Sequence, residues 1–218
     1  MKKINEELEK LEVELAKVNE KFMARMATYP NISHESTPAG KDENDNVPIF
    51  FWGNKPEFDF TPKNHQEIGR NLDILDDDRG AKVSGARFVY LKNEAVFLEF
   101  ALVQYVLNIL YLKGFIPLIP PILVKERAMF GTGFFPAERT QYYKTELDDL
   151  YLVGTAEVPL CSYHADEILD VNDLPLKYCG FSTCFRREAG SYGKDMGGMF
   201  RVHQFDKIEM FIFSHPVQ

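Results

Sequence analysis

The sequence predicts an α+β protein in which one N-terminal helix precedes a body built around an antiparallel sheet. Residues 4–22 carry apolar side chains at heptad spacing, and residues 94–113 form a second long helical pattern. Most strand-like segments follow residue 142. Strands grouped behind a single long helix do not suggest a doubly wound parallel sheet, so an antiparallel sheet is expected.

The heptad pattern at the N-terminus predicts a rod-like helix. Its apolar residues alternate spacings of four and three: Ile4, Leu8, Leu11, Leu15, Val18 and Phe22. We expect the helix to end at Tyr29, because Pro30 disfavours helical backbone in the residue before it. The apolar seam requires a partner helix, supplied either by a second copy of the chain or by a part of the protein outside this sequence.

Residues 30–62 are rich in Pro, Asn, Asp and Gly, which predicts a linker or ordered loop before a body that starts at residue 63. In that body, residues 64–75 are expected to be helical. The long helix that follows is closed by Gly114. Its polar residues Glu99, Gln104 and Asn108 are expected to share one stripe, which argues against a membrane span.

Three prolines in residues 115–121 predict an edge strand or an extended arm, because proline lacks an amide donor. The later strands are expected at residues 150–153, 178–187 and 200–213. A short helix is expected between Val158 and Leu169.

Composition excludes several classes of protein. The 218 residues are 45% apolar and 27% charged, as in a soluble globular protein of one or two domains. A net charge of −8 excludes bulk attraction to nucleic acid, so any RNA contact must be local. Cys161, Cys179 and Cys184 form no CxxC pair, which argues against a disulfide framework and favours a reducing, cytoplasmic compartment. No targeting segment is recognisable.

Alternate residues of the last two strands carry groups suited to a polyphosphate nucleotide. One face holds Cys184, Arg186, Glu188, Arg201, His203, Phe205, Lys207 and Glu209. Guanidinium groups bind phosphate, an aromatic ring stacks on a base, and carboxylates bind amines. The opposite face, with Val202, Ile208, Met210 and Ile212, is expected to be core. The alternative is an ordinary solvated sheet face with cross-strand ion pairs, and Phe205 could be a packed aromatic.

These residues resemble a known family. Phe185-Arg186-Arg187-Glu188, the glycine-rich loop at 190–198 and residues 201–210 resemble motif 2 of class II aminoacyl-tRNA synthetases, in the form found in seryl-tRNA synthetases. Residues 154–160 look like that family's serine-binding Thr-x-Glu segment. Residues 113–121 are similar to motif 1, the dimer-forming helix and strand, and the N-terminal helix resembles the returning helix of the tRNA-binding arm.

The resemblance covers essentially the whole chain and implies an incomplete class II catalytic core. Residues 1–29 would be the arm helix, 30–62 a linker and 63–218 a partial catalytic domain, without the first arm helix and motif 3. It implies a homodimeric, cytoplasmic serine:tRNA ligase that uses ATP with Mg²⁺ to form seryl-adenylate and charges tRNA(Ser), with no membrane association. One alternative is a non-catalytic, synthetase-derived binding module. Another is a relative that charges carrier proteins, although such relatives lack the helical arm.

The family's functional residues carry over by position. Arg186 would hold the ATP α-phosphate and the serine carboxylate and is the expected catalytic residue. The other ATP-binding residues implied are Arg187, Glu188, Arg201, Val202 and Phe205. The serine-binding residues implied are Thr155, Ala156, Glu157 and Glu209.

Three polar residues also have ordinary structural roles open to them. Thr155 could be a helix N-cap, and this role can coexist with serine binding. His164 and His203 have no Cys or His neighbours at metal-ligand spacing, so no metal ligand is assigned.

Overall fold

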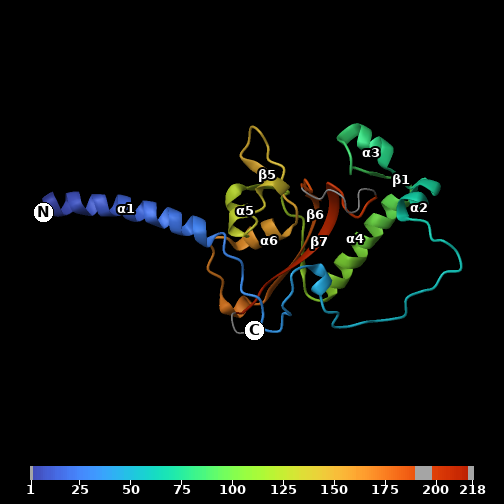
Figure 1. Ribbon diagram of the computed structural model, residues 1–218, viewed down its shortest axis with the longest axis horizontal. Coiled ribbons are helices and arrows are strands. Elements are labelled where there is room, and N and C mark those ends of the chain that lie inside the picture. The colour runs from blue at the N-terminus through green and yellow to red at the C-terminus, as the bar shows by residue number, and fades with distance from the viewer. Residues whose placement is uncertain (1, 190–197, 216–218) are drawn as a thin grey trace. The chain divides into compact units, whose positions relative to one another are not determined.

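A computed structural model of the chain describes residues 2–189 and 198–215, which divide into two compact units, Met1–Pro62 and Lys63–Gln218. The first unit contains helix α1, Lys2–Met26, and a short 3-10 helix, Glu43–Asp45 (Figure 1). Helix α1 ends three residues before the position expected from Pro30. The Thr28 hydroxyl donates to the Arg25 carbonyl oxygen at 2.8 Å, and this contact closes the last turn.

The heptad seam of α1 is open. Its six apolar side chains, Ile4, Leu8, Leu11, Leu15, Val18 and Phe22, are each more than half exposed, and α1 has no buried residue. The prediction that this seam requires a partner helix therefore remains a prediction.

The second unit begins with small elements that frame the main sheet. Helix α2, His65–Asn71, has a capping box in which Asn64 and Glu67 satisfy each other's backbone amides. Strands β1, Leu75–Asp76, and β2, Tyr90–Leu91, pair antiparallel on either side of helix α3, Asp77–Ser84. The sequence did not predict α3, whose run of Asp and Arg has no apolar stripe. Its cap is Asp76, whose side chain accepts from the Arg79 amide.

The main sheet has three strands in the order β3-β6-β7. Strand β3, Ile116–Leu118, is the expected edge strand and pairs parallel with β6, Leu176–Phe185. Strand β6 then pairs antiparallel with β7, Gln204–Phe213, over ten residue pairs. The α+β prediction is confirmed. The edge strand is parallel because a long crossover separates it from β6, and β7 begins later than predicted, at Gln204.

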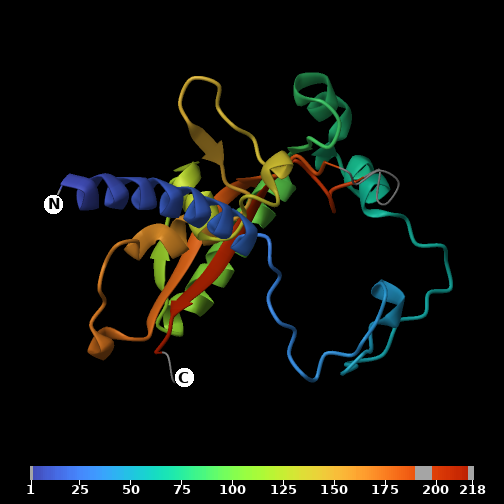
Figure 2. The same ribbon diagram turned by 60° about the vertical axis from the view of Figure 1, so that its left-hand side comes forward.

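Helix α4, Glu94–Leu112, lies along one face of β6 and β7 (Figure 2). The contact is small: Leu110 packs with Phe115 and Cys179, with Leu107 and Ile208 at its margin. This face of the hairpin was expected to be core. That prediction is wrong near the C-terminal end of β7. Met210 and Ile212 are 58% and 47% exposed, because α4 covers the strands only in part.

The polar residues of α4 do not share one stripe, contrary to expectation. Glu99 is half-buried and lines a cavity with Asp206 of the sheet, whereas Gln104 and Asn108 are exposed. The spacing explains the error: at 100° per residue, Asn108 lies about 180° around the helix from Glu99. Among the described residues, α4 alone is long and apolar enough to cross a membrane by length and composition.

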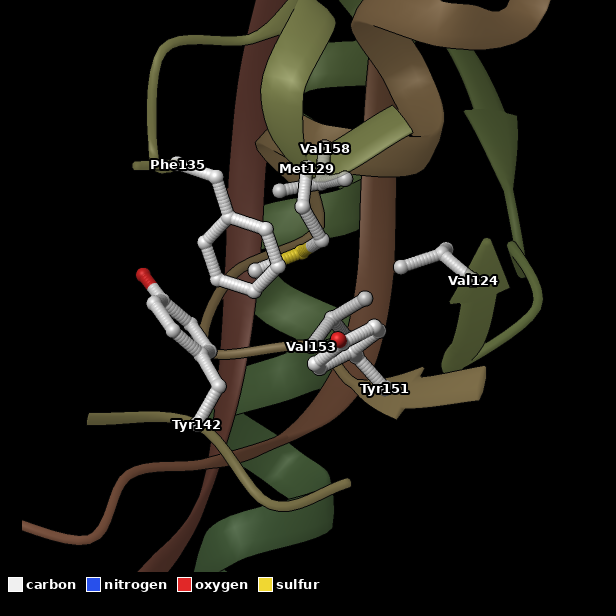
Figure 3. Packing of buried hydrophobic residues seen from close by; sticks show 7 residues of the cluster. All are labelled: Val124, Met129, Phe135, Tyr142, Tyr151, Val153 and Val158. Atoms are coloured by element: carbon white, nitrogen blue, oxygen red, sulfur yellow. The ribbon is translucent and has the colours of Figure 1, made fainter. Parts of the chain in front are cut away.

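The connection between β3 and β6 contains a separate two-stranded sheet. Strand β4, Leu123–Lys125, pairs antiparallel with β5, Leu150–Leu152, flanked by helices α5, Glu126–Gly131, and α6, Glu157–Cys161. Figure 3 shows the core that they enclose, with the rings of Phe135, Tyr142 and Tyr151 around Met129 and Val153. Val124 and Val158 complete the core, and Met129 and Val153 are fully buried. This core is a rigid base for the residues that follow β5.

An ion-pair network fastens α5 to this core. The Arg139 guanidinium donates to Glu126 and lies 4.4 Å from the centre of the Phe135 ring, and the Tyr151 hydroxyl donates to Glu126 at 3.0 Å. The hydrogen bonds from Arg139 and Tyr151 lower the pKa of Glu126 from 4.5 to about 2. A carboxyl whose pKa is lowered by folding stabilises the folded state above its unfolded pKa, and this effect disappears as the pH falls through the folded value.

We therefore expect Glu126→Gln to lower the free energy of unfolding at about pH 7, and the difference from the unmodified chain to shrink as the pH falls from about 4.5 to about 2. Urea unfolding at several pH values measures this. Glu146→Gln, at an exposed glutamate outside this network, is the matched control. A difference that stays constant with pH would contradict the assignment.

Candidate functional site

The candidate site lies on one face of the β6–β7 hairpin, opposite α4. The register pairs Cys184 with Phe205, Ser182 with Lys207, and Gly180 with Glu209. Side chains of directly paired residues project to the same face of a sheet, so these residues line up along the hairpin. Towards the C-terminal end of β7 the same face is apolar: Phe211 and Phe213 pack around Tyr178. The polar groups are thus confined to the half nearer the hairpin loop.

Helix α6 reaches this face at Gly180. A Cβ atom on Gly180 would lie 3.0 Å from Leu160 Cδ1 and 3.3 Å from Ala156 Cβ, so glycine lets the helix approach the sheet without displacing these side chains. A second contact ties the start of this segment to the hairpin, because the Phe185 amide donates to the Val153 carbonyl oxygen at 2.8 Å. Residues 154–156 are thereby held against the sheet.

Three side chains meet where α6 approaches the sheet, and we call them the Lys207–Thr155–Glu209 cluster. The Thr155 hydroxyl donates to Glu209 Oε2 at 2.6 Å and accepts from Lys207 Nζ at 2.9 Å. The Lys207 ammonium is also ion-paired with Glu209. Thr155 is 2% exposed, so its hydroxyl is removed from solvent.

Thr155 has a second role at the start of α6, because its hydroxyl also accepts from the Glu157 amide at 3.3 Å. The N-cap residue of α6 is Ala156, so Thr155 makes only a cap-like contact, one residue before the expected cap. The Thr155 side chain also faces the candidate site, and its serine-binding role stays a prediction.

The cluster sets the charge of Glu209. Partial burial raises the pKa of this carboxyl, but hydrogen bonds from Lys207 and Thr155 and the positive charges of Lys207 and Arg186 outweigh that effect, and the pKa is lowered. Glu209 is therefore an ionised acceptor at neutral pH. An ionised carboxylate in a half-buried site is suited to bind a cation such as a ligand ammonium.

Arg186 lies beside this cluster and is fixed at three points. Its Nε donates to the Gly154 carbonyl oxygen at 3.2 Å, and its guanidinium carbon lies 5.4 Å from the centre of the Phe205 ring. Its backbone continues the ladder past β6, since the Arg186 amide donates to the His203 carbonyl oxygen and His203 Nδ1 donates to the Arg186 carbonyl oxygen. The remaining guanidinium donors are available to a ligand anion.

Gly154 makes this position of Arg186 possible. A Cβ atom here would lie 2.9 Å from Tyr142 Cε1 and 3.3 Å from Arg186 Cγ. Gly154 stands within the Thr-x-Glu segment, but the sequence indicated no role for it. From the sequence, Lys207 was placed on the correct face of the hairpin but was assigned no functional role. The signal for Lys207 was its parity with Phe205 and Glu209, whereas the requirement for Gly154 is visible only in three dimensions.

The remaining predicted residues lie around this centre. Arg187 is exposed, and its amide donates to the Gln141 carbonyl oxygen at 2.8 Å. Glu188 Oε2 lies 3.8 Å from Arg201 Nε, at the entrance to the hairpin loop. The residues that lie off the charged face are Ala156, which is fully buried, Glu157, which is half-buried, and Val202, which lines a cavity on the side of Glu99.

The glycine-rich loop lies outside the described residues, apart from Gly198. In the described ranges 2–189 and 198–215, no group of three or more His, Cys, Asp or Glu side chains could hold a metal ion. His203 supports the Arg186 backbone, and His164 contacts Glu167 at 2.7 Å and the Tyr178 hydroxyl at 2.9 Å.

Comparison with known proteins agrees with this arrangement. Residues 141–218, which include the whole hairpin, match the family model described as the tRNA synthetase class II core domain (G, H, P, S and T). The chain is 47% identical over 216 residues to the serine–tRNA ligase of Treponema denticola and 45% identical over 215 residues to that of Thermobifida fusca. Each alignment covers 99% of this chain and 51% of the relative.

Solved structures give the same result in three dimensions. The chain is similar to seryl-tRNA synthetase from Pyrococcus horikoshii complexed with ATP, with a TM-score of 0.90 and 44% identity over 95% of this chain and 51% of that one. It is also similar to the cytoplasmic serine–tRNA ligase from Naegleria fowleri in complex with AMP, with a TM-score of 0.84 and 32% identity over 95% of this chain and 50% of that one. Over nearly its whole length the chain is thus similar to seryl-tRNA synthetases, and residues 141–218 match the class II core domain. It spans about half the length of these relatives.

Gly154→Ala tests the close approach that positions Arg186. We expect the added methyl group to displace Arg186 and Tyr142 and to lower the free energy of unfolding by about 1–3 kcal/mol, measured by urea denaturation. Gly131→Ala is the matched control, because nothing lies within 4 Å of a Cβ there, and its effect should stay within about 0.5 kcal/mol. Equal stability of the two variants would contradict the packing argument.

Proposed function

We propose that this chain carries the serine-activating site of a serine:tRNA ligase, which joins serine to ATP to give seryl-adenylate and pyrophosphate and then transfers serine to tRNA(Ser). The observation that carries the proposal is the convergence of Arg186, Phe205 and the Lys207–Thr155–Glu209 cluster on one face of the hairpin. A guanidinium that can bind an anion, an aromatic ring and a carboxylate that can bind an ammonium group lie side by side there. These are the groups needed to bind activated adenosine next to an amino acid.

In this proposal Arg186 is the catalytic residue. Its guanidinium bridges the α-phosphate of ATP and the serine carboxylate and stabilises the charge that develops as the carboxylate attacks phosphorus. The reaction needs no covalent enzyme intermediate, so catalysis consists of positioning and electrostatic stabilisation. The bond from Arg186 Nε to the Gly154 carbonyl oxygen supports this role, because it holds the side chain before a ligand arrives.

The other nucleotide contacts are assigned to residues around Arg186. Phe205 stacks on adenine and Val202 contacts the base through its main chain. Arg201 binds the outer phosphates, with Arg187 and Glu188 along the same edge. The similar structures from Pyrococcus horikoshii and Naegleria fowleri are complexes with ATP and AMP, which supports a nucleotide at this place.

Serine would bind between Thr155 to Glu157 and Glu209. Its ammonium and hydroxyl groups both have partners there, since Glu209 is an ionised acceptor and the Thr155 hydroxyl is buried. An amino acid without the hydroxyl would leave buried polar groups unpaired, a penalty that can discriminate by about 10⁴ or more. Ala156 is fully buried, so we assign it to the serine-binding segment without a side-chain contact to serine.

Mg²⁺ is expected to accompany ATP, but the described residues do not form a metal site of their own. Magnesium commonly keeps several water ligands and binds through substrate phosphates, so the described residues are assigned no step through the metal. For the chain as a whole we propose the arm helix at 1–29, the linker at 30–62 and the catalytic domain at 63–218. We further propose contact of the arm with tRNA(Ser) and a cytoplasmic location.

Titration of the chain with ATP and serine tests the site directly. We expect both ligands to bind and Arg186→Ala to weaken ATP binding strongly. In any longer polypeptide that contains this chain, the same variant should lower serine-dependent pyrophosphate exchange by about 10²–10³. Arg127→Ala is the matched control, since Arg127 is an exposed arginine paired with Asp166 away from the site. Exchange that depends on another amino acid would refute the assignment, and an absence of binding would favour a non-catalytic module.

We also propose a homodimer that forms through α4. Its outward side chains are apolar and more than half exposed: Phe97, Leu98, Phe100, Leu102, Tyr105 and Tyr111. An apolar helix face of this extent is typical of a protein–protein interface. The same composition would suit a membrane span, but one side of α4 is already packed on the sheet through Leu110, and Glu99 lies half-buried beside Asp206.

Light scattering should therefore give about twice the 25.1 kDa mass of one chain, and Leu98→Glu combined with Leu102→Glu should give the monomer mass. Ile168→Glu is the control, because Ile168 is a fully exposed apolar residue outside α4. A monomer in the unmodified chain, or a dimer that survives both α4 substitutions, would rule out this interface.

A further inference from the structure

The proposed serine pocket already contains an ammonium group, that of Lys207. It donates to the Thr155 hydroxyl at 2.9 Å and is ion-paired with the Glu209 carboxylate. These are the two acceptors that the proposed function assigns to the ammonium and hydroxyl of serine. The chain therefore fills the position of the ligand's positive charge with a positive charge of its own.

Two ammonium groups cannot share these acceptors without cost. Thr155 Oγ1 already donates to Glu209 Oε2 and accepts from Lys207 and from the Glu157 amide, so its hydrogen-bonding capacity is used. Two like charges within about 4 Å repel each other, and more strongly in a half-buried site than in water. An incoming ammonium must therefore displace the one that is present.

The Lys207 ammonium group can move away from these acceptors at little cost. Its side chain is 33% exposed, and a lysine ammonium on a four-carbon stem can reorient without moving the strand that carries it. Its neighbours Thr155 and Glu209 are held more firmly, the first by the start of α6 and the second by the centre of β7. The acceptors are thus fixed and the donor is mobile.

We propose that Lys207 is a positioning residue that acts as a placeholder for the substrate ammonium. Before a ligand binds, it holds Glu209 ionised and Thr155 oriented, and the amino acid's ammonium then exchanges for its own. The exchange conserves charge, because an amino acid also brings a carboxylate, with which the released Lys207 can pair. A ligand that lacks an ammonium group cannot drive the exchange. This inference rests on the proposed serine site.

Ethanolamine isolates the exchange, because it keeps the hydroxyl and ammonium groups of serine but has no carboxylate for Lys207 to bind. We expect isothermal titration to show that Lys207→Met binds ethanolamine about tenfold more tightly than the unmodified chain, since the competing ammonium is gone. Lys207→Arg keeps a cation beside Glu209 and should resemble the unmodified chain. Glu209→Gln removes the negative charge that the ammonium requires and should abolish ethanolamine binding, both alone and in combination with Lys207→Met.

The outcomes separate this inference from the function on which it rests. If serine binds the unmodified chain and requires Glu209, but Lys207→Met leaves ethanolamine binding unchanged or weaker, Lys207 is only a structural support and the placeholder role is wrong. If neither serine nor ethanolamine binds in a Glu209-dependent way, the serine site and the placeholder role fail together. Circular dichroism and thermal unfolding check that each variant is folded. Lys207→Gln replaces Lys207→Met in these comparisons if the methionine variant fails to fold.

Discussion

The close approach of α6 to the β6–β7 hairpin is the constraint on which the rest of the site depends. It occurs at Gly180, where an added Cβ atom would press tightly against Leu160 and Ala156. Because Gly180 is paired with Glu209, the helix reaches the sheet at the residue whose carboxylate it must meet. A few tenths of an ångström of separation there would weaken the 2.6 Å hydrogen bond from Thr155 to Glu209.

A second close approach, at Gly154, extends the same arrangement to Arg186. Two successive carbonyl groups contact the hairpin: Val153 accepts from the Phe185 amide, and Gly154 accepts from the Arg186 side chain. Val153 packs into the aromatic core around Tyr142 and Tyr151, so the segment that carries these carbonyl groups cannot move away from the hairpin without disrupting that core. The cationic and anionic halves of the site therefore share one rigid support, which is what positioning catalysis requires.

The electrostatics follow from this geometry. Half-burial by itself would raise the pKa of Glu209, and the cations placed around it reverse the direction of the shift. The site is therefore prepared for a ligand cation before one arrives. The opposite face of the hairpin shows the contrasting case: Glu99 of α4 faces the sheet, where burial and the adjacent Asp206 raise its pKa.

Sequence by itself determined the elements whose signal is local. The heptads of α1, the prolines beside β3 and the alternation of Arg186, Phe205 and Glu209 depend on periods of 3.5 and 2 that can be read along the chain. It did not reveal α3, which has no apolar stripe. From the sequence, Glu99 was also expected to share one exposed stripe of α4 with other polar residues, and Met210 and Ile212 were expected to be buried.

Only the tertiary structure decided which residues meet across long separations in the sequence. Thr155 and Glu209 are 54 residues apart, and Gly154 and Arg186 are 32 apart. No local pattern encodes such contacts, because they arise from the packing of one layer on another. The pairing of Lys207 with both Thr155 and Glu209 belongs to this second kind. The alternation of side chains along β7 predicted the face on which Lys207 lies. The approach of α6 to the sheet brought Thr155 to it.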